Sequence, residues 1–233
     1  MIKIKPIIGI VGRLYSGESN IICIEEIRLA VTKMGGIPLL ILPIYKIDMN
    51  LKKLYSQEEL KDLESILSFC DGFILPGGDT WYRLDEVVID YAIRRNKPLL
   101  AICLGMQALS KMLSGEKRIG YDNTIKNNTL INHLEPNNNY VHSVIIDKNS
   151  KLYSIIGDVE ITVNSRHSYH VPELDNTLVS ARSSDGLIEG VELKDKKFII
   201  GVQWHPESNL EDEHSKKLFK AFFDNFKYSQ KFH

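Results

Sequence analysis

The sequence has few cysteines, and their arrangement excludes two kinds of protein. Its 233 residues contain only Cys23, Cys70 and Cys103, an odd set without the CxxC spacing of a zinc site. So small a number does not suit a disulfide framework. At least one thiol is therefore free, and each cysteine has to be judged by its surroundings.

Long hydrophobic segments are missing as well. The longest apolar runs, such as residues 37–44 with two prolines, are far too short to cross a bilayer. The charged segment 1–5 lacks the apolar core of a signal peptide. We therefore expect a cytoplasmic protein with no membrane partner.

There is also no excess of positive charge. Lys and Arg number 29 against 30 Asp and Glu, a formal net charge of -1, so the chain offers no basic surface for nucleic acid. With 43% hydrophobic and 25% charged residues, the composition is that of an ordinary globular protein. Nucleic acid is therefore not an expected partner.

The first half of the chain alternates between strand and helix patterns. Ser56 and Glu59 have the spacing of a capping box at the start of one helix. Alternation of this kind implies right-handed crossovers and a parallel sheet. The expected strands cover 7–11, 37–42, 72–75 and 98–102, and the expected helices cover 21–33, 56–67, 85–95 and 104–113.

The second half is richer in strand patterns. A final helix over 211–228 has an apolar stripe that suits packing on a sheet. Segment 121–139 has many asparagines and no clear period, so we expect a surface segment with one short strand and no functional residues. With no linker or repeat, residues 1–233 are expected to form a single domain. The expected strands cover 141–146, 159–163, 177–182, 188–193 and 198–202.

Cys103 occupies a position typical of a nucleophile. The apolar strand that ends at Ile102 leads directly into Cys103 and the start of a helix, and Gly105 gives the backbone room to turn. This strand, nucleophile and helix order is the elbow that exposes a Ser or Cys above an α/β sheet. A buried structural cysteine is the commoner fate of a free thiol, so the assignment depends on finding a partner.

His205 and Glu207 supply the partner. They follow the expected strand 198–202 and, two residues apart on an extended segment, project to the same side. Glu207 can hold His205 in one tautomer, and His205 can accept the thiol proton and return it to a leaving amine. A solvated histidine at a strand end remains the simpler interpretation of His205 alone.

The segment LPGGDTW contributes backbone donors. Gly77 and Gly78 follow the strand 72–75, and their N–H groups together with that of Leu104 can form an oxyanion hole. An ordinary Pro-Gly turn explains this segment equally well when it is considered by itself.

Three motifs in this order, PGG, ICLGMQ and QWHPE, resemble the class I glutamine amidotransferase superfamily over nearly the entire chain. The segments PIIGIVGR, VNSRHSYHV and SSDGLIEGVEL are most similar to the γ-glutamyl hydrolases, including γ-glutamyl-γ-aminobutyrate hydrolases. The resemblance implies an α/β three-layer sandwich with a mostly parallel, flavodoxin-like central sheet and an additional small β region in the second half.

The resemblance also implies roles for individual residues. Cys103 matches the nucleophile, His205 the general base and acid, and Glu207 its orienting carboxylate. Gly78 and Leu104 match the oxyanion donors, and Gln107, Ser165 and His167 match residues beside the γ-glutamyl group; His170 competes with His167 as the pocket histidine. Leu104 stands where hydrolases often have arginine, which leaves the acceptor side of the substrate open.

The function expected from these observations is hydrolysis of a γ-glutamyl amide through a cysteine thioester, which releases glutamate and an amine or amino acid such as γ-aminobutyrate. The alternative is a glutaminase subunit that delivers ammonia to a separate synthase. A third interpretation is a catalytically inactive member of the superfamily that serves in binding.

No metal and no organic cofactor is expected. Members of such families often pair, so a homodimer is one expectation, and the partner is a small-molecule γ-glutamyl substrate.

Overall fold

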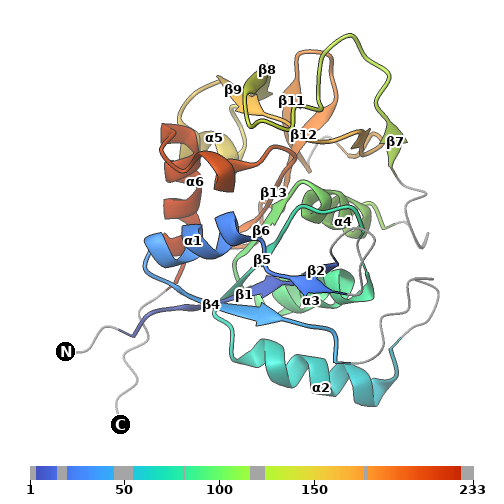
Figure 1. Ribbon diagram of the computed structural model, residues 1–233, viewed down its shortest axis with the longest axis vertical. Coiled ribbons are helices and arrows are strands. Elements are labelled where there is room, and N and C mark those ends of the chain that lie inside the picture. The colour runs from blue at the N-terminus through green and yellow to red at the C-terminus, as the bar shows by residue number, and fades with distance from the viewer. Residues whose placement is uncertain are drawn as a thin grey trace.

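The computed structural model describes residues 4–14, 20–44, 55–80, 82–115, 124–175 and 178–226. A nine-stranded sheet runs through the middle of the molecule (Figure 1). Five of its strands are parallel and lie in the order β4-β1-β5-β6-β13, which is 2-1-3-4-5 along the chain, the flavodoxin-like arrangement. These strands are β1 (Ile7–Val11), β4 (Ile37–Ile41), β5 (Gly72–Leu75), β6 (Leu99–Ile102) and β13 (Ile199–Val202).

Four antiparallel strands continue the same sheet beyond β13, in the order β12-β11-β8-β9. The β region predicted for the second half is therefore present, joined edge to edge with the parallel part. Its strands are β8 (Tyr140–Ile146), β9 (Glu160–Asn164), β11 (Val179–Ser183) and β12 (Ile188–Glu192). Two further small sheets pair β2 (Arg13–Leu14) with β3 (Ile21–Ile22) and β7 (Ile125–Lys126) with β10 (Tyr169–His170).

Helices cover both faces of the sheet, so the molecule has three layers (Figure 1). Side chains of successive strand residues point to opposite faces. In β6, Leu99 and Ala101 belong to the core under α2, α3 and α4, and Leu100 and Ile102 to the core under α1, α5 and α6. The helices are α1 (Glu25–Lys33), α2 (Gln57–Ser68), α3 (Arg83–Arg95), α4 (Leu104–Leu113), α5 (Lys151–Ile156) and α6 (Glu213–Asp224). None of these described helices is long and apolar enough to cross a membrane.

Most predicted elements are confirmed, and the differences have local causes. The helix expected from residue 21 begins at Glu25, because Ile21 and Ile22 pair with β2. The capping box of Ser56 and Glu59 is confirmed, with hydrogen bonds in both directions. The short helix α5 was not predicted. Residues 121–123, 177 and 227–228 of the predicted elements lie outside the described residues.

The expectation that segment 121–139 lies on the surface is wrong at one residue. The segment does contain the short strand β7, as predicted. His133, however, is only 3% exposed, because its ring turns inward against the antiparallel part of the sheet. A polar segment can therefore cover the protein and still contribute a buried side chain.

Gly105 sets the position of α4 on the sheet. A Cβ atom at this residue would lie 2.3 Å from the carbonyl oxygen of Leu75 in β5, closer than any real contact. Only glycine allows the first turn of the helix to approach the strand so closely. This approach brings Cys103, just before the helix, next to the carboxyl end of β5.

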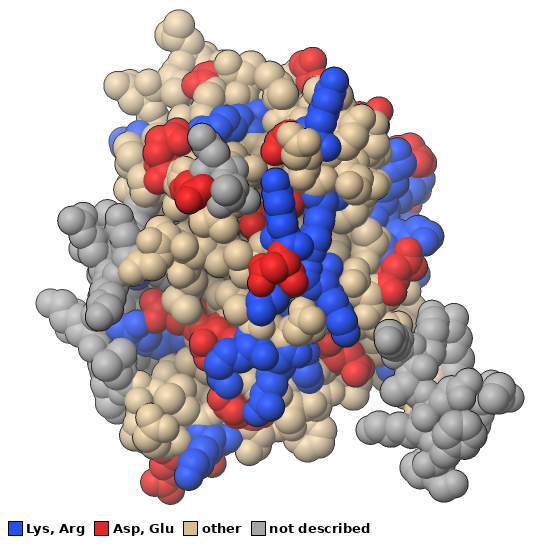
Figure 2. Space-filling model, turned by 180° about the vertical axis from the view of Figure 1, so that it is seen from behind, with Lys and Arg blue, Asp and Glu red and all other residues tan. Residues whose placement is uncertain are grey.

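Charges of both signs lie together on the described surface seen in Figure 2. On the face opposite to that of Figure 1, Lys and Arg side chains gather across the middle, but Asp and Glu side chains lie among them (Figure 2). Arg94 of α3, for example, lies 2.6 Å from Asp90 on its own helix and 2.6 Å from Glu64 on α2. This mixing agrees with the balanced charge of the sequence.

Candidate active site

Cys103 lies in the connection between β6 and α4 with a backbone that few residues other than glycine adopt. Its φ is 50° and its ψ is -107°. Such a conformation is strained by about 1–3 kcal/mol and persists only where its surroundings hold it. Here the Cys103 N–H donates to the Val202 carbonyl at 2.8 Å, and the Cys103 carbonyl accepts from the Gln107 N–H at 3.0 Å. The strand, turn and helix therefore form the predicted elbow.

His205 and Glu207 lie just beyond the end of β13 and are joined by a hydrogen bond. The distance from His205 Nδ1 to Glu207 Oε1 is 2.7 Å, and both side chains are buried. Asn164 fixes the backbone of His205 from the other side, because its amide accepts from the His205 N–H and donates to the His205 carbonyl, both at 3.0 Å. The imidazole is thus held in one orientation by two neighbours.

The His205 ring also contacts Cys103. Both residues lie against Gly77, where a Cβ atom would be 2.8 Å from His205 Cε1 and 3.4 Å from Cys103 Cβ. Burial alone would lower the pKa of His205, but the charges of Glu207 and Cys103 and its hydrogen bonds with both raise this pKa to about 10. The ring is therefore placed to carry a proton next to the sulfur of Cys103.

Two glutamines extend the polar contacts around the thiol. Gln203 Nε2 donates to Cys103 Sγ at 3.4 Å, and Gln107 Nε2 lies 3.3 Å from Gln203 Oε1. Gln203 was not predicted as a site residue. Residues 203 and 205 alternate along the segment that follows β13, so their spacing could have indicated Gln203. Glu207, expected on the same extended segment, instead lies in a short 3₁₀ helix, Pro206–Asn209, and still reaches His205 Nδ1.

Arg13 is a second residue that the sequence did not reveal. Its buried guanidinium donates to the carbonyls of Pro76 at 2.9 Å and Gly77 at 3.3 Å, and lies 2.8 Å from Asp85 in an ion pair. Gly78, which follows, has φ 154° and would place a Cβ 3.1 Å from the Arg13 side chain. Arg13 therefore fixes the backbone of the PGG turn. No local sequence pattern indicates that an arginine will be buried.

Replacing Arg13 with glutamine should destabilise the protein strongly. The change leaves Asp85 buried without its cation, which typically costs about 3–5 kcal/mol in the free energy of unfolding. Urea unfolding followed by circular dichroism measures the loss. The matched control is Arg28→Gln, which breaks an exposed pair with Glu25 and should cost less than about 1 kcal/mol. Equal losses in the two variants would contradict a buried structural role for Arg13.

A cavity of about 310 Å³ opens in front of the thiol. Among its described lining residues, the formally charged ones are the acid Asp79 and the base Arg166. Its other described lining residues come from the PGG turn, the elbow and start of α4, the segment just before β10, and the polar segment that contains β7. They are Gly78, Cys103, Leu104, Gln107, Thr124, Leu134, His167, Ser168 and Tyr169.

The predicted site residues differ in their relation to this cavity. Gln107 lines it and donates to the Tyr169 carbonyl at 3.0 Å. His167 also lines it, but its Nδ1 faces the Tyr169 carbonyl and its Nε2 faces Glu189. Ser165 is fully buried, is not among the lining residues, and donates to the His133 carbonyl at 2.8 Å. Its position supports a role in holding the backbone, not the predicted contact with substrate.

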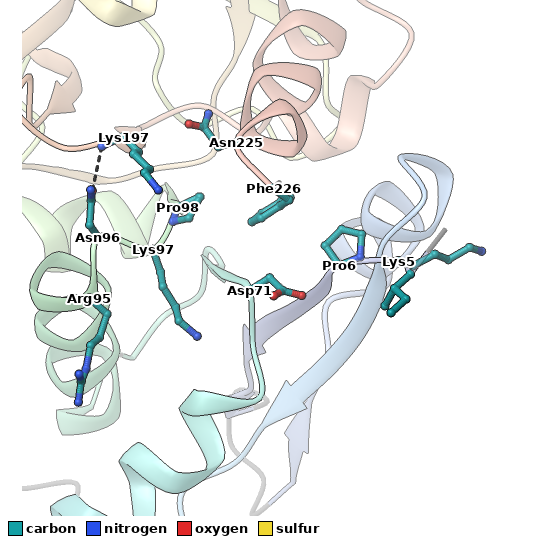
Figure 3. A pocket seen from close by; sticks show the side chains of 11 residues that line it. Lys5, Pro6, Asp71, Arg95, Asn96, Lys97, Pro98, Lys197, Asn225 and Phe226 are labelled. Atoms are coloured by element: carbon teal, nitrogen blue, oxygen red, sulfur yellow. Dashed lines mark hydrogen bonds between the residues drawn. The ribbon is translucent and has the colours of Figure 1, made fainter. Parts of the chain in front are cut away.

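Another cavity, of about 230 Å³, lies at the amino ends of the parallel strands, at the opposite end of the sheet from Cys103 (Figure 3). It is lined by residues that precede the parallel strands, including Pro6, Asp71 and Pro98, together with the basic side chains of Arg95 and Lys97. None of its described lining residues is a cysteine, serine or histidine. The groups suited to acyl transfer therefore gather at the carboxyl ends of the parallel strands, where open α/β folds bind their ligands.

Comparisons with known proteins agree with this architecture. The family described as Peptidase C26 matches residues 82–207. A glutamine amidotransferase-like protein of Rickettsia prowazekii is 28% identical over 97% of this chain and 99% of its own, and the γ-glutamyl-γ-aminobutyrate hydrolase PuuD of Escherichia coli is 28% identical over 94% and 92%. The glutaminase domain of Trypanosoma brucei CTPS with bound acivicin has a similar fold, with a TM-score of 0.64, 20% identity and 97% of each chain covered.

Proposed function

Because the chain belongs to the Peptidase C26 family, we propose that it is a hydrolase that cleaves γ-glutamyl amide bonds through a thioester on Cys103. One observation carries this proposal. A cysteine held at φ 50° lies beside a buried His205–Glu207 pair at the wall of a cavity. The assembly has the parts that acyl transfer by a thiol requires: a nucleophile, a proton carrier and a binding space.

The first half of the reaction acylates the enzyme. The sulfur of Cys103 attacks the γ-carbonyl carbon of the substrate, and a tetrahedral intermediate forms. The imidazolium of His205 then donates its proton to the nitrogen of the leaving amine, and the carbon–nitrogen bond breaks. The raised pKa of His205 supports this step, because the proton is already on the ring when the substrate arrives.

The second half releases glutamate. His205, now neutral, takes a proton from a water molecule that attacks the thioester carbonyl. The carbon–sulfur bond breaks, the sulfur of Cys103 leaves as a thiolate beside the protonated ring, and glutamate is released. Glu207, 2.7 Å from His205 Nδ1, stabilises the charged ring in both halves and keeps its other nitrogen available.

The oxyanion of each tetrahedral intermediate needs donors. The N–H of Leu104 opens helix α4 and has no acceptor within the helix, and Gly78 lies across the same cavity. These two N–H groups are our proposed oxyanion hole. Removal of one such donor typically lowers the rate by about a hundredfold or more.

A γ-glutamyl group carries an ammonium and a carboxylate, and the described lining of the cavity includes a side chain of each opposite sign. We assign Arg166 to the α-carboxylate and Asp79 to the α-ammonium. The Arg166 guanidinium also donates to Ser208 Oγ at 2.9 Å and lies 3.7 Å from Glu207, so its position is fixed before substrate binds. Gln107 contributes an amide on the same wall.

The similarity to a glutaminase domain favours a second candidate, a subunit that hydrolyses glutamine and delivers ammonia to a synthase. Incubation of the purified chain with γ-glutamyl-γ-aminobutyrate or with glutamine, with measurement of released glutamate, separates the two. We expect turnover of the γ-glutamyl amide by the chain alone. Turnover of glutamine only, and only with a synthase present, would favour the second candidate.

A further inference from the structure

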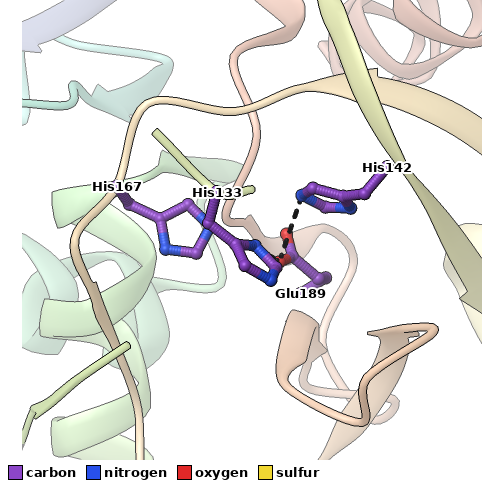
Figure 4. Close-up of side chains that lie close together, drawn as sticks. All are labelled: His133, His142, His167 and Glu189. Carbon is purple, nitrogen blue, oxygen red and sulfur yellow. Dashed lines mark ion pairs between the residues drawn. The ribbon is translucent and has the colours of Figure 1, made fainter. Parts of the chain in front are cut away.

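A cluster of four buried side chains lies behind the cavity wall, outside the proposed catalytic groups. It consists of His133, His142 on β8, His167 and Glu189 on β12, none more than 5% exposed. Figure 4 shows the three rings and the carboxylate close together, although they come from four separate segments. We refer to these four residues as the histidine cluster.

The atoms that face one another in the histidine cluster are close without being hydrogen bonded. Glu189 Oε1 lies 3.4 Å from His133 Nδ1, 3.4 Å from His167 Nε2 and 3.7 Å from His142 Nε2. None of these three nitrogens, and neither carboxylate oxygen, has a hydrogen-bond partner among the described residues. Hydrogen bonds between such groups would bring the atoms to about 2.7–3.2 Å.

The distances from Glu189 to the three ring nitrogens fit ligands of one shared metal ion better than they fit direct hydrogen bonds. A tetrahedral ion bound at about 2.0–2.1 Å keeps its ligand atoms roughly 3.3–3.4 Å apart. All four ligand atoms lie within 4.8 Å of one another, so the widest pair would move closer when an ion binds. The separations from Glu189 thus fit a shared ion, and the ring nitrogens need to move inward to bind it.

In each ring one nitrogen, the inner one, faces Glu189, and the other, the outer one, faces away. The hydrogen-bond partner of the outer nitrogen determines which of the two carries the hydrogen. His133 Nε2 is 2.9 Å from the carboxylate of Asp185, and His142 Nδ1 is 3.3 Å from the Ser143 carbonyl. Carboxylate and carbonyl oxygens only accept, so each outer nitrogen carries a hydrogen. In the neutral ring the inner nitrogen then presents a lone pair to the centre of the histidine cluster.

His167 follows the same pattern. Its Nδ1 is 3.0 Å from the Tyr169 carbonyl, which again requires a hydrogen on that nitrogen. The amide of Asn127 lies 3.4 Å from the same atom, but donates at 3.0 Å to the His167 carbonyl, its better acceptor. Metal-binding histidines commonly donate their second nitrogen to a carbonyl or carboxylate in this way.

We propose that His133, His142, His167 and Glu189 bind one divalent transition-metal ion, with Zn²⁺ as the best match. Three lone pairs and a carboxylate facing one another repel unless a ring takes up a proton or a cation lies between them, and burial removes the water that would otherwise compensate. Three imidazoles and one carboxylate are donors that suit zinc. Four protein ligands leave no open position, so the ion would stabilise structure and take no part in a reaction.

The ion would fix one wall of the cavity. His167 connects the histidine cluster to the Tyr169 carbonyl, which also accepts from Gln107. The backbone carbonyl of Glu189 accepts from the Gln203 N–H at 2.9 Å, next to the side chain that donates to Cys103. The inference itself does not depend on the reaction catalysed, since binding is measured directly.

Metal content and zinc titration test the proposal on the full chain. Protein stripped with a chelator and titrated with ZnCl₂ by calorimetry should bind one ion per chain, with a dissociation constant below about 0.1 µM. At a hundredfold excess over that constant, the melting temperature should rise by roughly 5–10 °C. Replacement with Co²⁺ should give the strong visible absorption of a four-coordinate ion. Folded protein that binds neither ion would overturn the proposal and leave only a buried polar network.

Variants locate the ion. Glu189→Gln and His142→Gln should each lose at least about tenfold in zinc affinity. His214→Gln, half-buried and outside the histidine cluster, and Cys103→Ser should both keep it. Zinc lost in Cys103→Ser but kept in His142→Gln would contradict the assignment. If the cluster variants do not fold, X-ray absorption of the zinc-loaded wild type decides: three imidazole nitrogens and one oxygen support the site, and any sulfur ligand contradicts it.

Discussion

Cys103→Ser is expected to lower kcat for glutamate release from a γ-glutamyl amide by roughly 10⁴-fold or more. The hydroxyl has nearly the size of the thiol, so the elbow and its hydrogen bonds to Val202 and Gln107 should persist. The hydroxyl, however, is a weaker nucleophile than the thiol and is less readily activated by the neighbouring His205. Steady-state kinetics and a melting curve measure the two effects separately, and the melting temperature should change little.

Cys23→Ser is the matched control for this experiment. Cys23 is partly buried at the start of α1, away from the cavity lining, and its variant should keep full activity. Burial raises the pKa of Cys23 and raises that of Cys70 to about 11, so iodoacetamide at neutral pH should label Cys103 first. A serine variant that keeps more than about 1% of wild-type activity would contradict the assignment of Cys103.

His205→Gln should have the second largest effect, a loss of roughly 10³- to 10⁶-fold in kcat with a much smaller change in KM. Without the imidazole, the leaving amine has no proton donor and the water has no base. The measurement is a full kinetic analysis with γ-glutamyl-γ-aminobutyrate. Iodoacetamide labelling of Cys103 should slow at the same time, because the sulfur loses its cationic neighbour.

Glu207→Gln serves as the graded comparison for His205. It keeps a hydrogen-bonding group near His205 Nδ1 but removes the charge that raises the pKa of the ring. We expect a loss of about 10²- to 10⁴-fold, smaller than that of His205→Gln. His170→Gln, a histidine bonded to Asn127 and absent from the cavity lining, should have little effect. Equal losses in His205→Gln and His170→Gln would contradict the proton-carrier role.

The parts of this molecule that were predictable from sequence depend on local signals. Apolar runs predicted the parallel strands, and all five are confirmed. The inner strands β5, β6 and β13 are buried on both faces, whereas the edge strand β4 is partly exposed. The elbow at Cys103 was predictable because its strand, its helix and Gly105 are adjacent in sequence. The predicted start of α1 was wrong because the apolar spacing of residues 21–33 fits a helix and gives no sign that β3 pairs with β2.

The parts that were not predictable depend on contacts between distant segments. The ion pair of Arg13 with Asp85 joins residues 72 positions apart, and an arginine in the sequence gives no sign that it will be buried. The histidine cluster joins segments from His133 to Glu189 without any regular ligand spacing. Segment 121–139 was therefore expected to hold no functional residue, although it supplies one of the four proposed ligands.

The measurement that tests the central claim most directly is trapping of the acyl-enzyme. A γ-glutamyl p-nitroanilide has a good leaving group, so acylation should outrun hydrolysis of the thioester and give a burst of p-nitroaniline. Acid quenching during the burst, followed by mass spectrometry of peptides, should find a glutamyl group on the peptide that contains Cys103. A glutamyl group on any other residue, or turnover without either burst or adduct, would contradict the account.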